Sequence, residues 1–282
     1  MTLSVIVTAY RSESTLQACV ERLRQDPAVR QILVADCSER APAVPVEVRR
    51  FPTPTPVPVM RWAMLDAVSE PVVACLEGRC VPEHGWGDAI AAAHAAHPEA
   101  PAIGGAVGIA AGARWMDAAV WLCEYAAFAP PLTETNVPDI SGAHLSYKTV
   151  ALHEQRELLA TGAWETRLHL AWRAQGRRLR TIPAQVIFRN AMSFSDFAQQ
   201  RFQYGREYAA ARCRGPRRFM YAALSPALPF LLTARTGVAA RRADRTGTFL
   251  RCLPGVFFFH AIWSAGELLG YCFGSSGKQH IY

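Results

Sequence analysis

The stretch that decides the fold reads Val72-Val73-Ala74-Cys75-Leu76-Glu77-Gly78-Arg79-Cys80-Val81-Pro82-Glu83-His84-Gly85-Trp86. Its first five residues form an apolar run that is typical of a buried strand, and Pro82 then indicates the start of a helix. Between them, Glu77 and Arg79 flank a glycine. The pattern predicts that a buried strand delivers one acidic and one basic side chain to its carboxyl end.

The surrounding sequence alternates between strand-like and helix-like patterns. Strands are predicted at 3–9, 31–36 and 71–76, and helices at about 14–25, 59–69 and 83–96. This alternation predicts a parallel sheet covered by helices on both faces. Ligands of open α/β sheets bind outside the carboxyl ends of the strands. Thr8, Asp36 and the segment 77–79 fall at such ends, so we expect the functional site there.

The composition is that of a folded α/β protein. The chain has 282 residues, of which 51% are hydrophobic and 19% charged, enough to bury a full core and too apolar for a disordered chain. Eight cysteines include no Cys-x-x-Cys pair, and no signal-type segment precedes the first strand. These features favour a reduced, cytoplasmic setting. Cys75 and Cys80 are interpreted as a core residue and a loop residue rather than half of a zinc site.

Segment 77–79 resembles the Asp-x-Asp motif of family-2 glycosyltransferases of the GT-A fold, which hold a divalent cation there against a nucleotide-sugar diphosphate. Further blocks resemble this family in the same chain order, over roughly the first 210 residues. They are Leu3–Tyr10, Ile32–Ser38, Arg61–Ala63, Ser141–Lys148 and Trp164–Leu168. The family's Asn in the fourth block is replaced by His144, and Glu165 stands at the position of the family's general base.

The resemblance implies a GT-A fold, with a mixed, mostly parallel sheet flanked by helices at 1–210 and a membrane-associated helical tail at 211–282. It implies sugar transfer from a nucleotide-diphosphate sugar to a glycan or lipid-linked acceptor, in synthesis of cell-surface polysaccharide or glycolipid. It assigns Glu165 as the catalytic base and places His144 and Trp164 on the acceptor side. The nucleotide-sugar-binding residues that it implies are Thr8, Tyr10, Asp36, Arg61, Glu77 and Arg79.

Several of these residues also have a purely structural interpretation. Asp36 is placed to cap the next helix, and Arg61 is placed to be a surface charge on an amphipathic helix. His144 fits a packed core position. Glu165 fits the first turn of a helix, where an acid interacts favourably with the helix dipole.

Two replacements argue against the family's metal. Arg79 stands where a metal-binding Asp is expected, and Phe188 stands where the family has a metal-binding His. A hard divalent cation such as Mn²⁺ or Mg²⁺ needs oxygen ligands that Glu77 alone does not supply, so the sequence predicts no cofactor. In one reading Arg79 binds the diphosphate directly, giving an inverting, metal-independent transferase. In the other the domain has lost turnover and binds a nucleotide, a glycan or a partner protein. A Rossmann dehydrogenase is disfavoured because no Gly-x-Gly-x-x-Gly follows the first strand.

The formal net charge of +7 is concentrated late in the chain, where arginines bracket two apolar stretches at 219–234 and 253–273. This arrangement favours the cytoplasmic face of an anionic membrane. The second stretch is long enough to span, although His260 and Glu267 would be costly at the bilayer centre. The alternative is a helical hairpin buried against the rest of the protein. Nucleic-acid binding is disfavoured because no stacking platform or reader motif accompanies the arginines.

Overall fold

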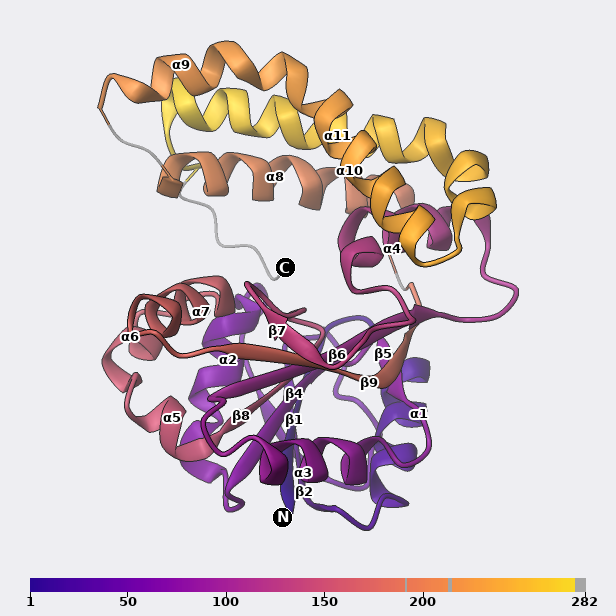
Figure 1. Ribbon diagram of the computed structural model, residues 1–282, viewed down its shortest axis with the longest axis vertical. Helices are drawn as coiled ribbons and strands as arrows, with labels where there is room; N and C mark the ends of the chain where they lie inside the picture. The colour runs from indigo at the N-terminus through magenta and orange to yellow at the C-terminus, as the bar shows by residue number, and fades with distance from the viewer. Residues whose placement is uncertain (191, 213–214, 277–282) are drawn as a thin grey trace. The chain divides into compact units, whose positions relative to one another are not determined.

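The computed structural model describes residues 1–190, 192–212 and 215–276. The chain divides into two compact units (Figure 1). The first, here called the sheet unit, contains residues 1–110 and 130–189. The second, the helical unit, contains 111–129 together with the described residues from Asn190 onward.

The sheet unit is built around β1, which pairs in parallel with β2 and β4. Farther out, β3 pairs in parallel with β2. On the other side, β8 runs antiparallel to β4 and β6, β9 runs parallel to β6, and β5 and β7 are antiparallel to β9. The strands are β1 (Leu3–Ala9), β2 (Val29–Asp36), β3 (Glu47–Arg50), β4 (Val72–Glu77), β5 (Cys80–Pro82), β6 (Ala102–Ile109), β7 (Thr135–Val137), β8 (His144–Lys148) and β9 (Leu179–Phe188). The predicted mixed, mostly parallel sheet is confirmed.

Helices flank this sheet and follow the predicted pattern with shifted ends. They are α1 (Glu13–Arg24), α2 (Val57–Ala63), α3 (Trp86–Ala96), α5 (Thr149–His153), α6 (Arg156–Ala160) and α7 (Glu165–Ala174). The helix predicted at 59–69 ends at Ala63 and is followed by the 3-10 turn Leu65–Ala67. The helix predicted from residue 83 begins at Trp86, because β5 first pairs with β9.

Several strands were not predicted from the sequence, among them β8 and β3. The segment 141–148, expected as an acceptor-side loop, is a loop only to Ala143 and then forms β8 in the middle of the sheet. Ser146 in β8 is buried, and its hydroxyl donates to the carbonyl oxygen of Ile103 at 2.9 Å. The edge strand β3 is short and largely exposed, and it lacks the apolar run that marks the central strands.

The helical unit contains α4 (Trp115–Tyr125), the 3-10 turn η2 (Ala126–Phe128), α8 (Phe194–Arg212), α9 (Arg217–Leu224), the 3-10 turn η3 (Ser225–Ala227), α10 (Leu228–Arg242) and α11 (Thr246–Phe273) (Figure 1). The expected domain boundary at 210–211 falls inside α8. The unit that holds the tail therefore also holds 111–129 and 190–210, because α11 packs along both α8 and α4.

Glycines set the distance between α8 and α11. A Cβ atom built on Gly266 would lie 2.1 Å from the carbonyl oxygen of Phe202, and one on Gly205 would lie 2.2 Å from the carbonyl oxygen of Trp263. Gly270 meets the carbonyl oxygen of Arg206 in the same way. The two backbones therefore approach more closely than any side chain at these positions would permit.

Within the described part of the chain, α11 is the helix that is long and apolar enough to cross a membrane. Two of its polar residues, His260 and Glu267, are buried within the helical unit, at 3% and 4% exposed. The His260 Nε2 lies 3.2 Å from the Thr236 hydroxyl, and the Trp263 Nε1–H donates to Glu267 at 2.6 Å. Both polar groups have partners inside the protein, so they do not have to face lipid.

Candidate active site at the carboxyl edge of the sheet

The strand register gathers the predicted site residues at one edge of the sheet. Thr8 is the register partner of Glu77, and Ala9 is the partner of Asp36. The antiparallel strand β8 begins at this edge, since His144 pairs with Leu76. The carboxyl ends of β1, β2 and β4 thus meet here, as the sequence predicts.

Arg79 and Phe188, the two positions at which the metal ligands are replaced, lie against each other. Cys80 pairs with Phe188 between β5 and β9, and the Arg79 guanidinium carbon lies 5.3 Å from the Phe188 ring centroid. The guanidinium donates to the Glu77 carboxylate at 2.7 Å. Both the Arg79 and Phe188 side chains are nearly fully buried. The Arg79 guanidinium thus lies between a carboxylate and an aromatic ring, and both groups stabilise its positive charge.

Asp36 is fully buried at the end of β2 and is bonded on both carboxylate oxygens. The Ser38 hydroxyl donates to one oxygen at 2.7 Å, and the Ser38 backbone N–H donates to the other at 3.3 Å. Arg50, at the end of the neighbouring strand β3, forms an ion pair with the same carboxylate. Asp36 therefore ties β2, β3 and the following loop together.

Arg61 and Glu165 form a buried ion pair between α2 and the first residue of α7. Their side chains are 1% and 7% exposed. A second Arg61 nitrogen donates to the carbonyl oxygen of Gly142 at 3.1 Å. Gly142 lies just before β8, so the pair lies at the same edge of the sheet as Glu77.

The other nucleotide-side and acceptor-side residues are placed differently. The Thr8 hydroxyl is buried and donates to the carbonyl oxygen of Leu76 at 3.3 Å. Tyr10 directly follows β1. The guanidinium carbon of Arg11 lies over the Tyr10 ring, 5.1 Å from the ring centroid. Trp164 precedes α7 and is 40% exposed. Trp164 can therefore offer aromatic surface to a ligand, whereas the Tyr10 ring is covered by Arg11 on one face and the Thr8 hydroxyl is bonded within the sheet.

His144 is a core residue in this structure. Its Nε2 accepts from the Trp86 Nε1–H at 2.7 Å, and its Nδ1–H donates to the carbonyl oxygen of Ala106 at 2.9 Å. Complete burial lowers the pKa of His144 to about 4, so the ring is neutral at pH 7. Because both ring nitrogens are occupied, His144 has no polar atom left for an acceptor hydroxyl, and the structure gives it a packing role.

The carboxylates of the predicted site share one property: each is paired with an arginine of the same chain. Asp36 pairs with Arg50, Glu77 with Arg79, and Glu165 with Arg61. Among the described residues no cluster of three His, Cys, Asp or Glu side chains is arranged to hold a metal ion. The residues present therefore do not fit the divalent cation of the family, and their charges are balanced by guanidinium groups instead.

Arg50 and the contacts that anchor the loop before β8 were not predicted from the sequence. Arg50 is the register partner of Asp36, and finding it requires knowing that β3 exists. The loop before β8 is anchored at both ends: Gly142 accepts from Arg61, and the Asp139 carboxylate bonds to Nδ1 of His169 on α7. The His169 Nε2 lies 3.1 Å from the Tyr147 hydroxyl, which continues this chain into the core.

Solved structures resemble this chain across both units. A mannosyltransferase from Pyrobaculum calidifontis, PcManGT, solved with GDP-Man and Mn²⁺, matches 95% of this chain and 86% of its own, at 15% identity and a TM-score of 0.52. The chain has a GT-A fold.

Two further resemblances are weaker. TarS 1-349 of S. aureus matches 99% of this chain and 93% of its own, at 14% identity and a TM-score of 0.49. Glucosyl-3-phosphoglycerate synthase from Mycobacterium tuberculosis matches 76% of this chain and 80% of its own, at 14% identity and a TM-score of 0.48. No protein-family model matches this GT-A chain. No curated protein matches its sequence.

Proposed function

We propose that this chain is a glycosyltransferase that binds a nucleotide-diphosphate sugar without a divalent ion. The observation that carries the proposal is the Glu77–Arg79 pair beside Phe188. Arg79 stands at the position where the family resemblance puts a metal-binding Asp. Its planar set of N–H donors matches the geometry of phosphate oxygens, so Arg79 is suited to donate hydrogen bonds to a departing diphosphate.

Glu165 is proposed as the base of an inverting transfer. It accepts the proton of the acceptor hydroxyl while that oxygen bonds to the anomeric carbon, and the nucleoside diphosphate leaves with the electron pair of the broken bond. Arg61 stabilises the ionised carboxylate, which is the form that a base needs. The exposed ring of Trp164, one residue earlier, offers a surface for an acceptor sugar.

A second candidate function, nucleotide or glycan binding without turnover, is favoured by a different observation. Both oxygens of Asp36 are already bonded within the chain, and Glu165 is paired with Arg61. Taking up an acceptor proton would neutralise Glu165 and leave the buried Arg61 charge unpaired, which opposes turnover more than it opposes nucleotide binding. This alternative differs from the first in one measurable respect, because it predicts nucleotide binding with no sugar transfer.

Nucleotide diphosphates are expected to stabilise the protein in the presence of a chelator. Thermal unfolding is measured with UDP, GDP and CDP, each with EDTA and with Mn²⁺. Arg79→Ala is expected to lose most of the shift, because it removes the guanidinium that is proposed to bind the diphosphate. Arg167→Ala, a charge removed from α7, is the control and keeps the shift. A shift that requires Mn²⁺ in the parent protein contradicts the proposal.

The acceptor is proposed to be a glycan or a lipid-linked molecule at the cytoplasmic face of the membrane. We expect the full chain to sediment with vesicles of anionic lipid at about 0.1 M salt and to be released as salt is raised, since surface charges are then screened. The fraction in the pellet is the measurement. A chain that stays in the supernatant at low salt, without detergent, overturns the membrane assignment.

A further inference from the structure

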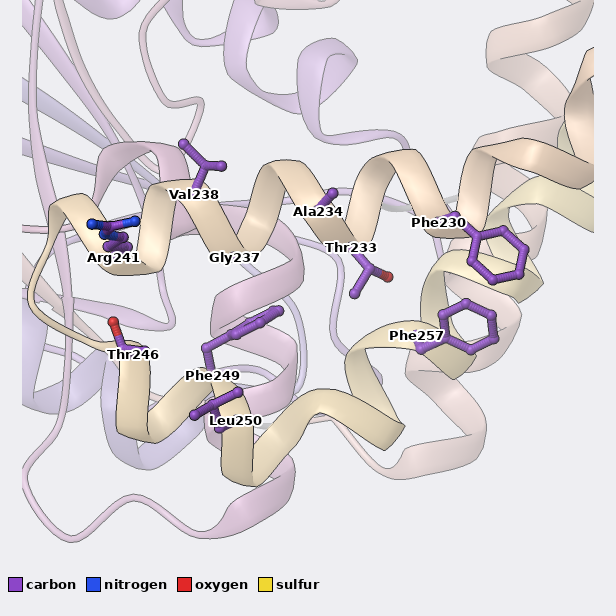
Figure 2. Close-up of a pocket in the computed structure, with 10 residues that line it drawn as sticks. All are labelled: Phe230, Thr233, Ala234, Gly237, Val238, Arg241, Thr246, Phe249, Leu250 and Phe257. Atoms are coloured by element: carbon purple, nitrogen blue, oxygen red, sulfur yellow. The ribbon is translucent and has the colours of Figure 1, made fainter.

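An apolar groove runs between α10 and α11 within the helical unit (Figure 2). Its volume is about 480 Å³, which lies in the range of small-molecule sites, roughly 300–1,000 Å³. Figure 2 shows the two ends to be different: Arg241 and Thr246 lie at one end, and the rings of Phe230 and Phe257 lie at the other. The rings contact each other edge to face, with centroids 5.2 Å apart.

The lining of the groove is partly exposed rather than part of a closed core. Phe230 is 68% exposed, Leu250 60% and Val238 52%. The apolar surface continues along α10 to Leu231, which is 54% exposed. Large apolar side chains left open in a row beside a groove indicate contact with an apolar partner.

The charge around this surface is strongly one-sided. Between residues 208 and 266 the sequence contains a single acid, Asp244, and no lysine. The same stretch contains nine arginines, at positions 212, 214, 217, 218, 235, 241, 242, 245 and 251. Arg241 lines the groove, Arg242 is the last residue of α10, and Arg245 directly precedes α11. The partner therefore combines an apolar body with an anionic end.

The length of the groove matches an acyl chain. From Phe230 to Arg241 the helix rises roughly 16 Å, at about 1.5 Å per residue. One leaflet of a bilayer has a hydrocarbon thickness of roughly 15 Å, half of the whole core. A chain lying along α10 thus extends from a phosphate at Arg241 to the aromatic pair at the far end.

We propose that the groove between α10 and α11 binds one acyl chain of an anionic phospholipid, whose phosphate pairs with Arg241. The groove makes the proposed membrane association specific, because it gives the surface a site for an individual lipid. The proposal does not depend on sugar transfer, and its test measures binding without turnover.

The test uses the full chain and short-chain phosphatidylglycerol below its critical micelle concentration, followed by calorimetry. We expect saturable binding of one lipid per chain, with phosphatidylcholine binding more weakly. Arg241→Gln is expected to weaken the binding roughly fivefold, the effect of one arginine on an anionic headgroup. Arg235→Gln removes the same charge from the same helix at an exposed position outside the groove, and it is expected to bind as the parent does.

A second variant tests the groove itself. A Cβ atom on Gly237 would lie 3.0 Å from two ring carbons of Phe249, so Gly237→Leu fills the groove, and leucine suits a helix better than glycine. We expect this variant to lose binding of the monomeric lipid, and its thermal unfolding transition is measured alongside to show that it is still folded. Undiminished binding by Gly237→Leu, equal losses in Arg235→Gln and Arg241→Gln, or no binding by the parent overturns the proposal. If Gly237→Leu no longer binds monomeric lipid but still sediments with vesicles, the result supports the groove as the lipid site, and it shows that the membrane association does not depend on the groove.

Discussion

Glu165→Gln is expected to slow sugar transfer by a factor of about 10² to 10⁴, the usual contribution of a general base, while nucleotide binding is retained. The amide keeps the shape of the side chain and still accepts from Arg61, but it cannot take up the acceptor proton. The measurement is the rate of transfer from each donor that stabilises the parent protein, with binding followed separately by thermal shift.

The structure supplies the control for this experiment. Glu165→Gln leaves the buried charge of Arg61 without its counter-charge, and breaking a buried pair costs about 3–5 kcal/mol of stability. The double variant Arg61→Gln/Glu165→Gln removes both charges, so it is expected to regain stability and to stay inactive. Transfer at the parent rate by Glu165→Gln shows that the base is another residue. A parent protein that binds nucleotides and transfers no sugar supports the binding function instead.

Gly266→Ala is expected to lower the free energy of unfolding by about 3 kcal/mol, the upper part of the usual range for overpacking. The added methyl group would meet the carbonyl oxygen of Phe202 at 2.1 Å, so α8 and α11 must separate along their length. Backbone atoms cannot turn aside as a flexible side chain can. The measurement is urea unfolding followed by circular dichroism.

Gly247→Ala is the matched control for that variant. Gly247 lies on the same helix, and a Cβ atom there has no other atom within 4 Å. Alanine in a helix is preferred over glycine by about 0.5–1 kcal/mol, so this variant is expected to be as stable as the parent or slightly more so. Equal effects of the two substitutions contradict the close helix contact.

The central strands and the site edge follow from the sequence because they depend on local patterns. The apolar run 72–76 predicts the strand, and the polar residues that follow it predict that its carboxyl end lies at the site. The resemblance also predicts that Arg79 and Phe188 replace two ligands of the same ion. Two ligands of one ion must be neighbours, and the side chains of Arg79 and Phe188 are in contact. Arg79 and Phe188 are distant in the sequence, so it is the family resemblance, and not a local pattern, that relates them.

The ion pairs and the role of His144 depend on contacts distant in sequence. Arg61 and Glu165 are 104 residues apart, and no local pattern connects them. Arg50 pairs with Asp36 because of an edge strand whose sequence carries no apolar signal. His144 has a polar side chain, as a site residue would. It pairs with Leu76 in the middle of the sheet, and its side chain is buried in the core.

The helical unit is assembled from segments made at different times. The Trp115 Nε1–H of α4 donates to the Arg251 carbonyl oxygen on α11 at 3.1 Å, and a Cβ atom on Gly255 would touch the Trp115 ring. At about 5–20 residues per second, synthesis reaches the end of α11 roughly 7–30 s after α4 is complete. During that interval α4 has no α11 to cover its apolar face. A ribosome-bound chain stalled before residue 246 is therefore a natural client for chaperones that bind exposed apolar helices.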